Sequence, residues 1–153
     1  MADLQTLLAK AEQVETLSGA IYRRLAAGFP EGARAWRIYQ QLAQEEDEHA
    51  KRIRILEANL RSRPVPQQLT VDLPAVEQLV ADAAALLRML DELGPHLSVE
   101  ESRRFMVAME RRFGAVHAHA LVAGDPELEA FFGELAFQDQ THLELLERLD
   151  GNG

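Results

Sequence analysis

Most of the prolines and glycines in this chain fall in a few short clusters, and this distribution most constrains its fold. The clusters lie at 28–32, 64–66, 94–95, 124–126 and 151–153. The segments between them are rich in Ala, Leu, Glu, Arg and Gln, which favour helices, and show no strand-like alternation. We therefore predict an all-α fold with five helices, near 3–28, 32–61, 74–93, 98–123 and 126–149.

Two of these helices have recognisable start signals. Ser98 with Glu101 predicts a capping box, and Asp125 followed by Pro126 predicts an N-cap before a proline in the first helical position. The segment 62–73 contains two prolines and is predicted to be an extended surface crossover. A length of 153 residues predicts a single domain spanning 1–153.

Charge and composition exclude several classes of partner and site. The formal net charge of −9 repels phosphate backbones and anionic lipids, so we expect no nucleic-acid and no membrane partner. The absence of cysteine excludes disulfides and thiolate metal sites within the chain, so a metal would need His and carboxylate ligands. The first residues lack the features of a signal peptide, which predicts a cytoplasmic protein.

Carboxylates interrupt the otherwise apolar face of four of the predicted helices. Steps of three and four residues along each helix identify positions that share a face. In the helices near 3–28, 32–61, 98–123 and 126–149, the middle of this face carries Glu15, then Glu46 with His49, then Glu110, then Asp139 with His142. Burying four carboxylates together is costly unless cations or protons neutralise them.

Helix register predicts that these side chains meet. Glu15 precedes Gly28 by as many positions as Glu46 follows Ala33. At 1.5 Å of rise per residue, both carboxylates lie roughly 20 Å from the turn of their helical hairpin. Glu110 and Asp139 lie at this same sequence distance from the turn of their own hairpin. Two hairpins packed face to face would therefore bring all six side chains into one layer.

The two halves of the chain also repeat. The offset in residue number from Glu15 to Glu110 is 95, and that from Glu46 to Asp139 is 93. The same offsets relate other positions on the apolar faces: Tyr22 to His117, Leu42 to Leu135 and His49 to His142. The repeat indicates a duplicated helical hairpin with pseudo-twofold symmetry.

Charge counting identifies the chemistry that such a layer suits. Two divalent cations would neutralise four carboxylates, and two neutral imidazoles add no charge. A lone Glu from two helices with Glu-x-x-His from two others is the ligand pattern of di-iron and di-manganese four-helix proteins. Mixed carboxylate and imidazole ligation suits iron or manganese and tolerates zinc. We therefore predict two iron ions, with manganese or zinc as alternatives.

At these residues the chain resembles the ferritin-like superfamily, and within it the rubrerythrin-type proteins that lack a rubredoxin domain. The resemblance covers about 8–57 and 103–149 and includes the run 45–50, Glu-Glu-Asp-Glu-His-Ala. It implies a four-helix bundle of two hairpins with an extra helix, about 74–93, in the long crossover. It further implies that Glu15 and Glu110 are terminal ligands and that Glu46 and Asp139 bridge the metals. The imidazole ligands would be His49 and His142.

The chain departs from the family pattern in three respects. Asp139 stands where the family has Glu and is one methylene shorter, which favours a weaker second site. Rubrerythrins carry an extra Glu one turn from the lone Glu of the second hairpin, whereas this chain has Val107 and Phe113 there. The stretch between His49 and Glu110 is longer than is usual for the family. Without a rubredoxin module, electrons would come from an external donor.

Three further residues are candidates to contact the ligands rather than the metal: Tyr22, Tyr39 and His117. The helical rise places His117 about 10 Å from the metal layer, so we expect a hydrogen-bonding role for it. For the two tyrosines, packing with a satisfied hydroxyl is the simpler alternative. No catalytic residue beyond the metal ligands is identified. Glu45 is expected on the solvated face, with a position beside the ligand layer as the alternative.

The sequence thus predicts a dinuclear-iron carboxylate oxidoreductase that oxidises Fe(II) or reduces dioxygen or peroxide. A non-enzymatic protein that binds iron or zinc is one alternative, and a polar layer that only fixes helix register is another. Ferritin-like relatives commonly assemble, so the resemblance implies a homodimer. The apolar stripe of the helix near 74–93 would then cover either the outside of the bundle or the subunit contact.

Overall fold

The computed structural model describes the whole chain except residues 1, 65–67, 94–96, 120 and 150–153. Five helices and two short strands lie in the described residues: α1 (Ala2–Ala26), α2 (Arg34–Leu60), β1 (Thr70–Val71), α3 (Leu73–Leu93), α4 (Val99–Ala118), β2 (Val122–Ala123) and α5 (Pro126–Glu147). The prediction of an all-α fold with five helices is confirmed. None of the helices in this part of the chain is long and apolar enough to cross a membrane.

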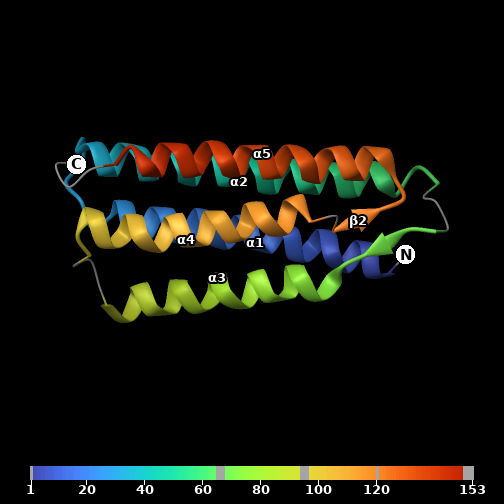
Figure 1. Cartoon of the computed structure of the whole chain (residues 1–153), viewed down its shortest axis with the longest axis horizontal. Helices are drawn as coiled ribbons and strands as arrows, with labels where there is room; N and C mark the ends of the chain where they lie inside the picture. The colour runs from blue at the N-terminus through green and yellow to red at the C-terminus, as the bar shows by residue number, and fades with distance from the viewer. Residues whose placement is uncertain (1, 65–67, 94–96, 120, 150–153) are drawn as a thin grey trace.

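The helices run along the long axis of the molecule (Figure 1). α1 packs along α2 after the turn at 27–33, and α4 packs along α5 in the same way. α3 belongs to the connection between these pairs and lies along α1. Its buried residues are Val76, Leu79, Ala83 and Leu90. The apolar stripe of α3 therefore covers α1 within the same chain.

Both predicted helix starts are present. The Ser98 hydroxyl accepts a hydrogen bond from the backbone N–H of Glu101, whose carboxylate accepts one from the N–H of Ser98. The Asp125 carboxylate accepts hydrogen bonds from the N–H groups of Glu127 and Leu128, and Pro126 occupies the first helical position. These caps satisfy backbone donors that a helix leaves unpaired.

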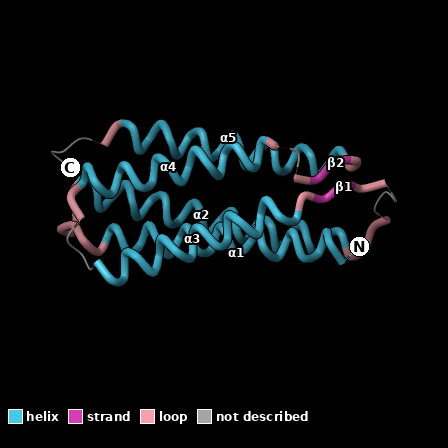
Figure 2. The backbone as a smooth tube through the Cα atoms, turned by 60° about the horizontal axis from the view of Figure 1, so that its bottom comes forward, coloured by secondary structure: helices cyan, strands magenta, loops and turns pink. Residues whose placement is uncertain are grey.

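The predicted helix 98–123 is wrong at its end, because α4 stops at Ala118 and the chain becomes extended. Val122 and Ala123 form β2, which pairs antiparallel with β1 from the crossover, Thr70 opposite Ala123 (Figure 2). Gly124 follows with φ 109°, and a Cβ there would lie 2.8 Å from the carbonyl oxygen of Gln68. Such short strands cannot show alternation, so the sequence pattern missed them.

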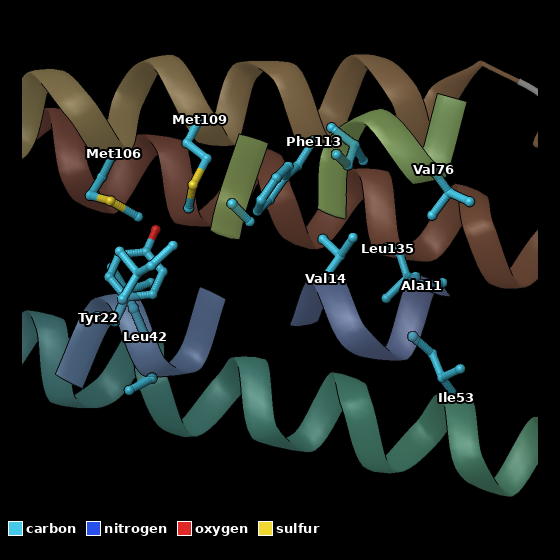
Figure 3. Close-up of a cluster of buried hydrophobic side chains, with 14 of the residues drawn as sticks. Ala11, Val14, Tyr22, Leu42, Ile53, Val76, Met106, Met109, Phe113 and Leu135 are labelled. Atoms are coloured by element: carbon cyan, nitrogen blue, oxygen red, sulfur yellow. The ribbon is translucent and has the colours of Figure 1, made fainter. Parts of the chain in front are cut away.

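Apolar side chains fill the core on both sides of the predicted polar layer. Figure 3 shows Tyr22, Leu42 and Met106 gathered toward one end, and Ala11, Ile53 and Leu135 toward the other. All six are buried. Along α1 and α2, the carboxylates Glu15 and Glu46 lie between these two apolar groups. Water has little access to a polar layer placed in this way.

Candidate metal centre

All six predicted ligands are buried at mid-height of four helices. The fractional exposures of Glu15, Glu46 and His142 are 0%, and those of Glu110, Asp139 and His49 are 1%, 2% and 4%. Glu15 comes from α1, Glu46 and His49 from α2, Glu110 from α4, and Asp139 and His142 from α5. Such complete burial of four carboxylates is unusual and requires a compensating partner.

Five of these side chains form two groups that could each hold a metal ion. The first group is Glu15, Glu46 and His49, and the second is Glu46, Glu110 and His142. Within each group the candidate ligand atoms lie within 4.8 Å of one another. Glu46 belongs to both groups, which is the position expected of a bridging carboxylate. The groups therefore describe two adjacent sites joined by α2.

The distances show how closely the donors converge. Nδ1 of His49 lies 3.7 Å from Oε2 of Glu15 and 3.7 Å from Oε1 of Glu46. Nδ1 of His142 lies 2.9 Å from Oε1 of Glu46 and 3.5 Å from Oε1 of Glu110. The two imidazole rings stack, with centroids 5.5 Å apart and an interplanar angle of 14°.

Many of these buried donor atoms have no hydrogen-bond partner among the described residues. They are both carboxylate oxygens of Glu15 and of Glu46, Oε2 of Glu110, Nδ1 of His49 and both ring nitrogens of His142. The atoms approach one another without the alignment of a hydrogen bond, as ligands of a shared cation do. An unpaired buried polar atom costs about 1–3 kcal/mol, so such a concentration disfavours a purely structural role. The donor set fits a divalent metal pair.

Asp139 lies outside both groups. Its Oδ2 atom is 2.5 Å from Nδ1 of His117, with which it forms a buried hydrogen bond. The other ring nitrogen of His117 lies 4.0 Å from Oε1 of Glu15. His117 is thus closer to the layer than its rise along α4 predicts, because helical side chains tilt toward the N-terminus of their helix. The carboxylate predicted to bridge is held by an imidazole instead.

The two tyrosines occupy different positions relative to the cluster. The Tyr22 hydroxyl donates a hydrogen bond of 2.6 Å to Oε1 of Glu110, so it contacts a predicted ligand. Figure 3 shows Tyr22 pointing from α1 toward Met106 on α4. The Tyr39 hydroxyl instead shares a hydrogen bond of 2.6 Å with Oγ of Ser102. The two tyrosine rings stack with centroids 6.0 Å apart.

Glu45 is a neighbour of the cluster that the sequence pattern placed on the solvated face. Its Oε2 atom lies 2.9 Å from Nε2 of His142, while its side chain is 40% exposed. Contact with His142 lowers the pKa of Glu45. In the sequence, its position beside Glu46 at the edge of the apolar face was the only indication of this contact. Other acidic residues lie in the same run, so this indication does not single out Glu45. A carboxylate on the second nitrogen of an imidazole ligand orients the ring.

The metal-free cluster must hold protons. Burial, together with the charge of Glu15, raises the pKa of Glu46 well above its usual range. Burial opposes the charged form of His142, but its contacts with Glu110, Glu45 and Glu46 raise its pKa overall. Protons thus take the place that cations would occupy, and cations would have to displace them.

Glu15 and the His117–Asp139 pair complete this charge balance. Burial favours the neutral form of Glu15, but its approach to His49 and Glu46 and the charge of His117 lower its pKa to about 2. Burial raises the pKa of Asp139 to about 7. Burial also opposes the charged form of His117, yet the Asp139 carboxylate raises its pKa. This pair therefore retains a proton at neutral pH.

Comparisons of the chain with known protein families, with curated proteins and with solved structures found no match.

Proposed function

We propose that this protein binds two metal ions, iron by preference, and acts as a dinuclear-iron oxidoreductase that oxidises Fe(II) or reduces dioxygen or peroxide. One observation carries the proposal. Glu46 is shared by two buried groups of carboxylate and imidazole donors, and most of their atoms lack a hydrogen-bond partner among the described residues. Manganese and zinc accept the same ligand types and are the alternative metals.

The fold proposed with this function is a ferritin-like four-helix bundle of two hairpins. The pairs α1–α2 and α4–α5 and the fifth helix in the crossover support it. So does the repeat of site positions at offsets of 95 and 93 in residue number. In this arrangement every helix of the bundle contributes at least one carboxylate to the same layer.

The side chains of the cluster have different proposed roles in metal binding. Glu15 and His49 would hold one ion, Glu110 and His142 would hold the other, and Glu46, which belongs to both groups, would contribute to each site. The Tyr22 hydroxyl fixes one oxygen of Glu110, which leaves Oε2 for a metal. The Glu45 carboxylate lies 2.9 Å from Nε2 of His142, on the side of the ring toward solvent. The apolar residues above and below the layer close both of its ends to water.

Two ferrous ions bound there would supply two electrons, which with two protons reduce dioxygen to hydrogen peroxide, or hydrogen peroxide to two waters. The chain has no cysteine and hence no thiolate redox centre of its own. Repeated turnover would therefore depend on an external electron donor.

Anaerobic titration of chelator-treated protein with Fe(II) tests the proposal. We expect about two irons per chain, which matches the two donor groups. Air or hydrogen peroxide is then admitted in a stopped-flow instrument, and rapid appearance of ferric absorbance is expected. Glu46→Gln is the matched control, because it keeps the side-chain shape but removes the shared charge. Failure of the wild-type chain to bind any iron, manganese or zinc would contradict the proposal.

A second candidate function is non-enzymatic iron or zinc binding. The contact between Asp139 and His117 favours it, because it removes one carboxylate from the ligand set. Tight binding of two ions without oxidation by air or peroxide would support this carrier role. A polar layer that only fixes helix register predicts that adding metal leaves the melting temperature unchanged.

A further inference from the structure

A cavity of about 260 Å³ opens between α4 and α5 and reaches the predicted metal layer. Glu110 and Asp139 form its inner end and are almost completely buried. Oε2 of Glu110 has no hydrogen-bond partner among the described residues, so a buried carboxylate with one unpartnered oxygen lines the cavity. Arg111 and Gln140 lie at its exposed rim. The cavity thus connects solvent with the second donor group.

Small side chains make this passage. Gly114, Ala115, Ala118 and Ala136 line its walls. A Cβ added at Gly114 would lie 3.6 Å from Cβ of Asp139, so this glycine keeps the approach to Asp139 open. The cavity volume is below the roughly 300–1,000 Å³ of sites for drug-sized ligands. Any occupant must be small.

The first hairpin also has a cavity at the equivalent place, of about 420 Å³, but none of the predicted ligands lines it. The repeat offsets of 95 and 93 relate Gly19 to Gly114 and Asp47 to Gln140. At Gly19, an added Cβ would meet Oδ1 of Asp47 at 2.9 Å. Asp47 also forms an ion pair with Arg23, whose equivalent in the second hairpin is Ala118. The ion-paired residues Arg23 and Asp47 line a cavity that stops short of the ligands, whereas alanine and glutamine at the equivalent positions line one that reaches Glu110 and Asp139.

We propose that the α4–α5 cavity is the entrance for a small neutral oxidant, dioxygen or hydrogen peroxide, on its way to the metal layer. This inference rests on the proposed function. Between the rim and the inner carboxylates, the alanine and glycine walls offer no side-chain ligand to a hydrated divalent cation, and the cationic Arg111 at the rim repels it. Glu45 is a partly exposed carboxylate in contact with His142 and suits a cation better.

Two variants close the proposed entrance. Gly114→Leu fills the wall, with Gly133→Leu as its matched control, because a Cβ at Gly133 meets nothing within 4 Å. The double variant Ala118→Arg, Gln140→Asp copies the ion pair of the first hairpin at two exposed positions and provides a second test if leucine at 114 disturbs folding. Neither variant replaces a predicted metal ligand.

The first measurement is the rate at which bound Fe(II) is oxidised, with dioxygen and with hydrogen peroxide in separate runs. We expect both closing variants to bind iron as the wild type does. The rate with at least one oxidant should fall about tenfold, an added entry barrier of about 1.4 kcal/mol, and the affected oxidant is the one that uses the cavity. Gly133→Leu should react at the wild-type rate. Unchanged rates with both oxidants in both closing variants would overturn the inference.

The second measurement needs no metal. Dissolved dioxygen is paramagnetic and enhances the relaxation of methyl groups that it approaches. In the metal-free protein we expect the enhancement at Ala136 to fall in Gly114→Leu and to stay at the wild-type level in Gly133→Leu. Enhancement at Ala136 that is unchanged in Gly114→Leu would exclude entry of dioxygen here. If the wild-type chain binds no iron, the proposed function fails, and this comparison alone decides whether the cavity admits dioxygen.

Discussion

The α1–α2 and α4–α5 hairpins carry equivalent polar residues but use them differently. In the first hairpin, Glu15, Glu46 and His49 all belong to one donor group. In the second, Glu110 and His142 join Glu46, while Asp139 pairs with His117. One missing methylene at position 139 accompanies this difference. The two donor groups therefore share a single carboxylate, from the first hairpin, and under the proposed function we expect the second hairpin to bind its ion less tightly.

A second comparison concerns Tyr22 and His117, which are related by the same repeat. Each faces the lone glutamate of the opposite hairpin, Tyr22 at 2.6 Å from Glu110 and His117 at 4.0 Å from Glu15. Only the tyrosine makes a hydrogen bond across the hairpins, because the histidine is turned to Asp139. Positions related by the repeat thus have different partners in the two hairpins.

The largest expected effect is on metal affinity, and it distinguishes Glu46 from Asp139, the two predicted bridging carboxylates. Glu46→Gln removes the carboxylate common to both donor groups, and we expect the affinity for both ions to fall more than about 100-fold, beyond the usual effect of losing a residue that only supports a ligand. Asp139→Asn should weaken one site only, by about tenfold. Titration with Fe(II) or Co(II) measures both effects. Equal losses in the two variants would show that the hairpins are used alike.

A pH effect of the His117–Asp139 pair comes next. The pKa of Asp139 rises from 3.8 to about 7 on folding, and that of His117 also rises. Both groups bind protons more tightly in the folded chain, so their contribution to stability is full at low pH and declines as pH rises through about 7. We expect the unfolding free energy of the metal-free protein to fall by on the order of a few kcal/mol between pH 4 and pH 8.

Urea denaturation in the presence of a chelator measures this change. Asp139→Asn should flatten the profile, since the amide does not titrate. The pKa of Glu15 is lowered to about 2, so this carboxyl has the opposite effect on stability. Its contribution is full above about pH 4.5 and is lost as the pH falls toward 2. A wild-type profile that rises between pH 5 and pH 8 would rule out the proposed proton sharing.

The tyrosine hydrogen bonds give a smaller effect. Tyr22→Phe leaves the Glu110 carboxylate without its donor, and hydrogen bonds to charged groups contribute about 1.5–3 kcal/mol. Tyr39→Phe is the matched control, because its neutral bond to Ser102 should cost about 0.5–1.5 kcal/mol. Chemical denaturation of the metal-free variants tests the order. A larger loss in Tyr39→Phe would mean that stacking, rather than the contact with Glu110, determines the contribution.

The smallest expected effect is on stability, and it distinguishes Gly114 from its first-hairpin equivalent Gly19. Gly114→Ala should raise the unfolding free energy by about 0.5–1 kcal/mol, because alanine favours the helix and its Cβ makes an ordinary contact. Gly19→Ala gains the same propensity but displaces the Asp47 carboxylate from Arg23, so its net change should be smaller. Thermal denaturation resolves the difference. A larger gain in stability for Gly19→Ala would contradict the close approach of the Asp47 carboxylate to position 19.

The sequence predicted the helices well because their signals are local. Proline and glycine clusters marked the connections, and Ser98 and Asp125 marked two helix starts. The end of α4 and the β1–β2 pair could not be predicted in the same way. They depend on hydrogen bonds between segments far apart in the chain, such as that from the N–H of Asp72 to the carbonyl of Leu121. No periodicity in either segment reports such a pairing.

The candidate site was predictable as a layer but not in its internal pairing. Helical periodicity and register identified six buried side chains, and five of them lie in the two donor groups. The contact of Asp139 with His117 depends on side-chain length and tilt, which spacing along one helix does not reveal. The sequence offered a position of Glu45 beside the ligand layer only as an alternative, because its contact with His142 depends on how α2 and α5 face each other.

The short pairing of β1 with β2 also has a consequence for how the hairpins align lengthwise. It ties the crossover before α3 to the connection before α5, with Thr70 opposite Ala123. Slippage by one residue would displace the strands by about 3.3 Å, more than metal–ligand distances tolerate. Gly124 permits the close approach that holds this alignment, because any larger residue would bring its Cβ to 2.8 Å from the Gln68 carbonyl oxygen. The β1–β2 pair thus restricts sliding of the hairpins along the long axis and keeps donors from separate helices at the same height.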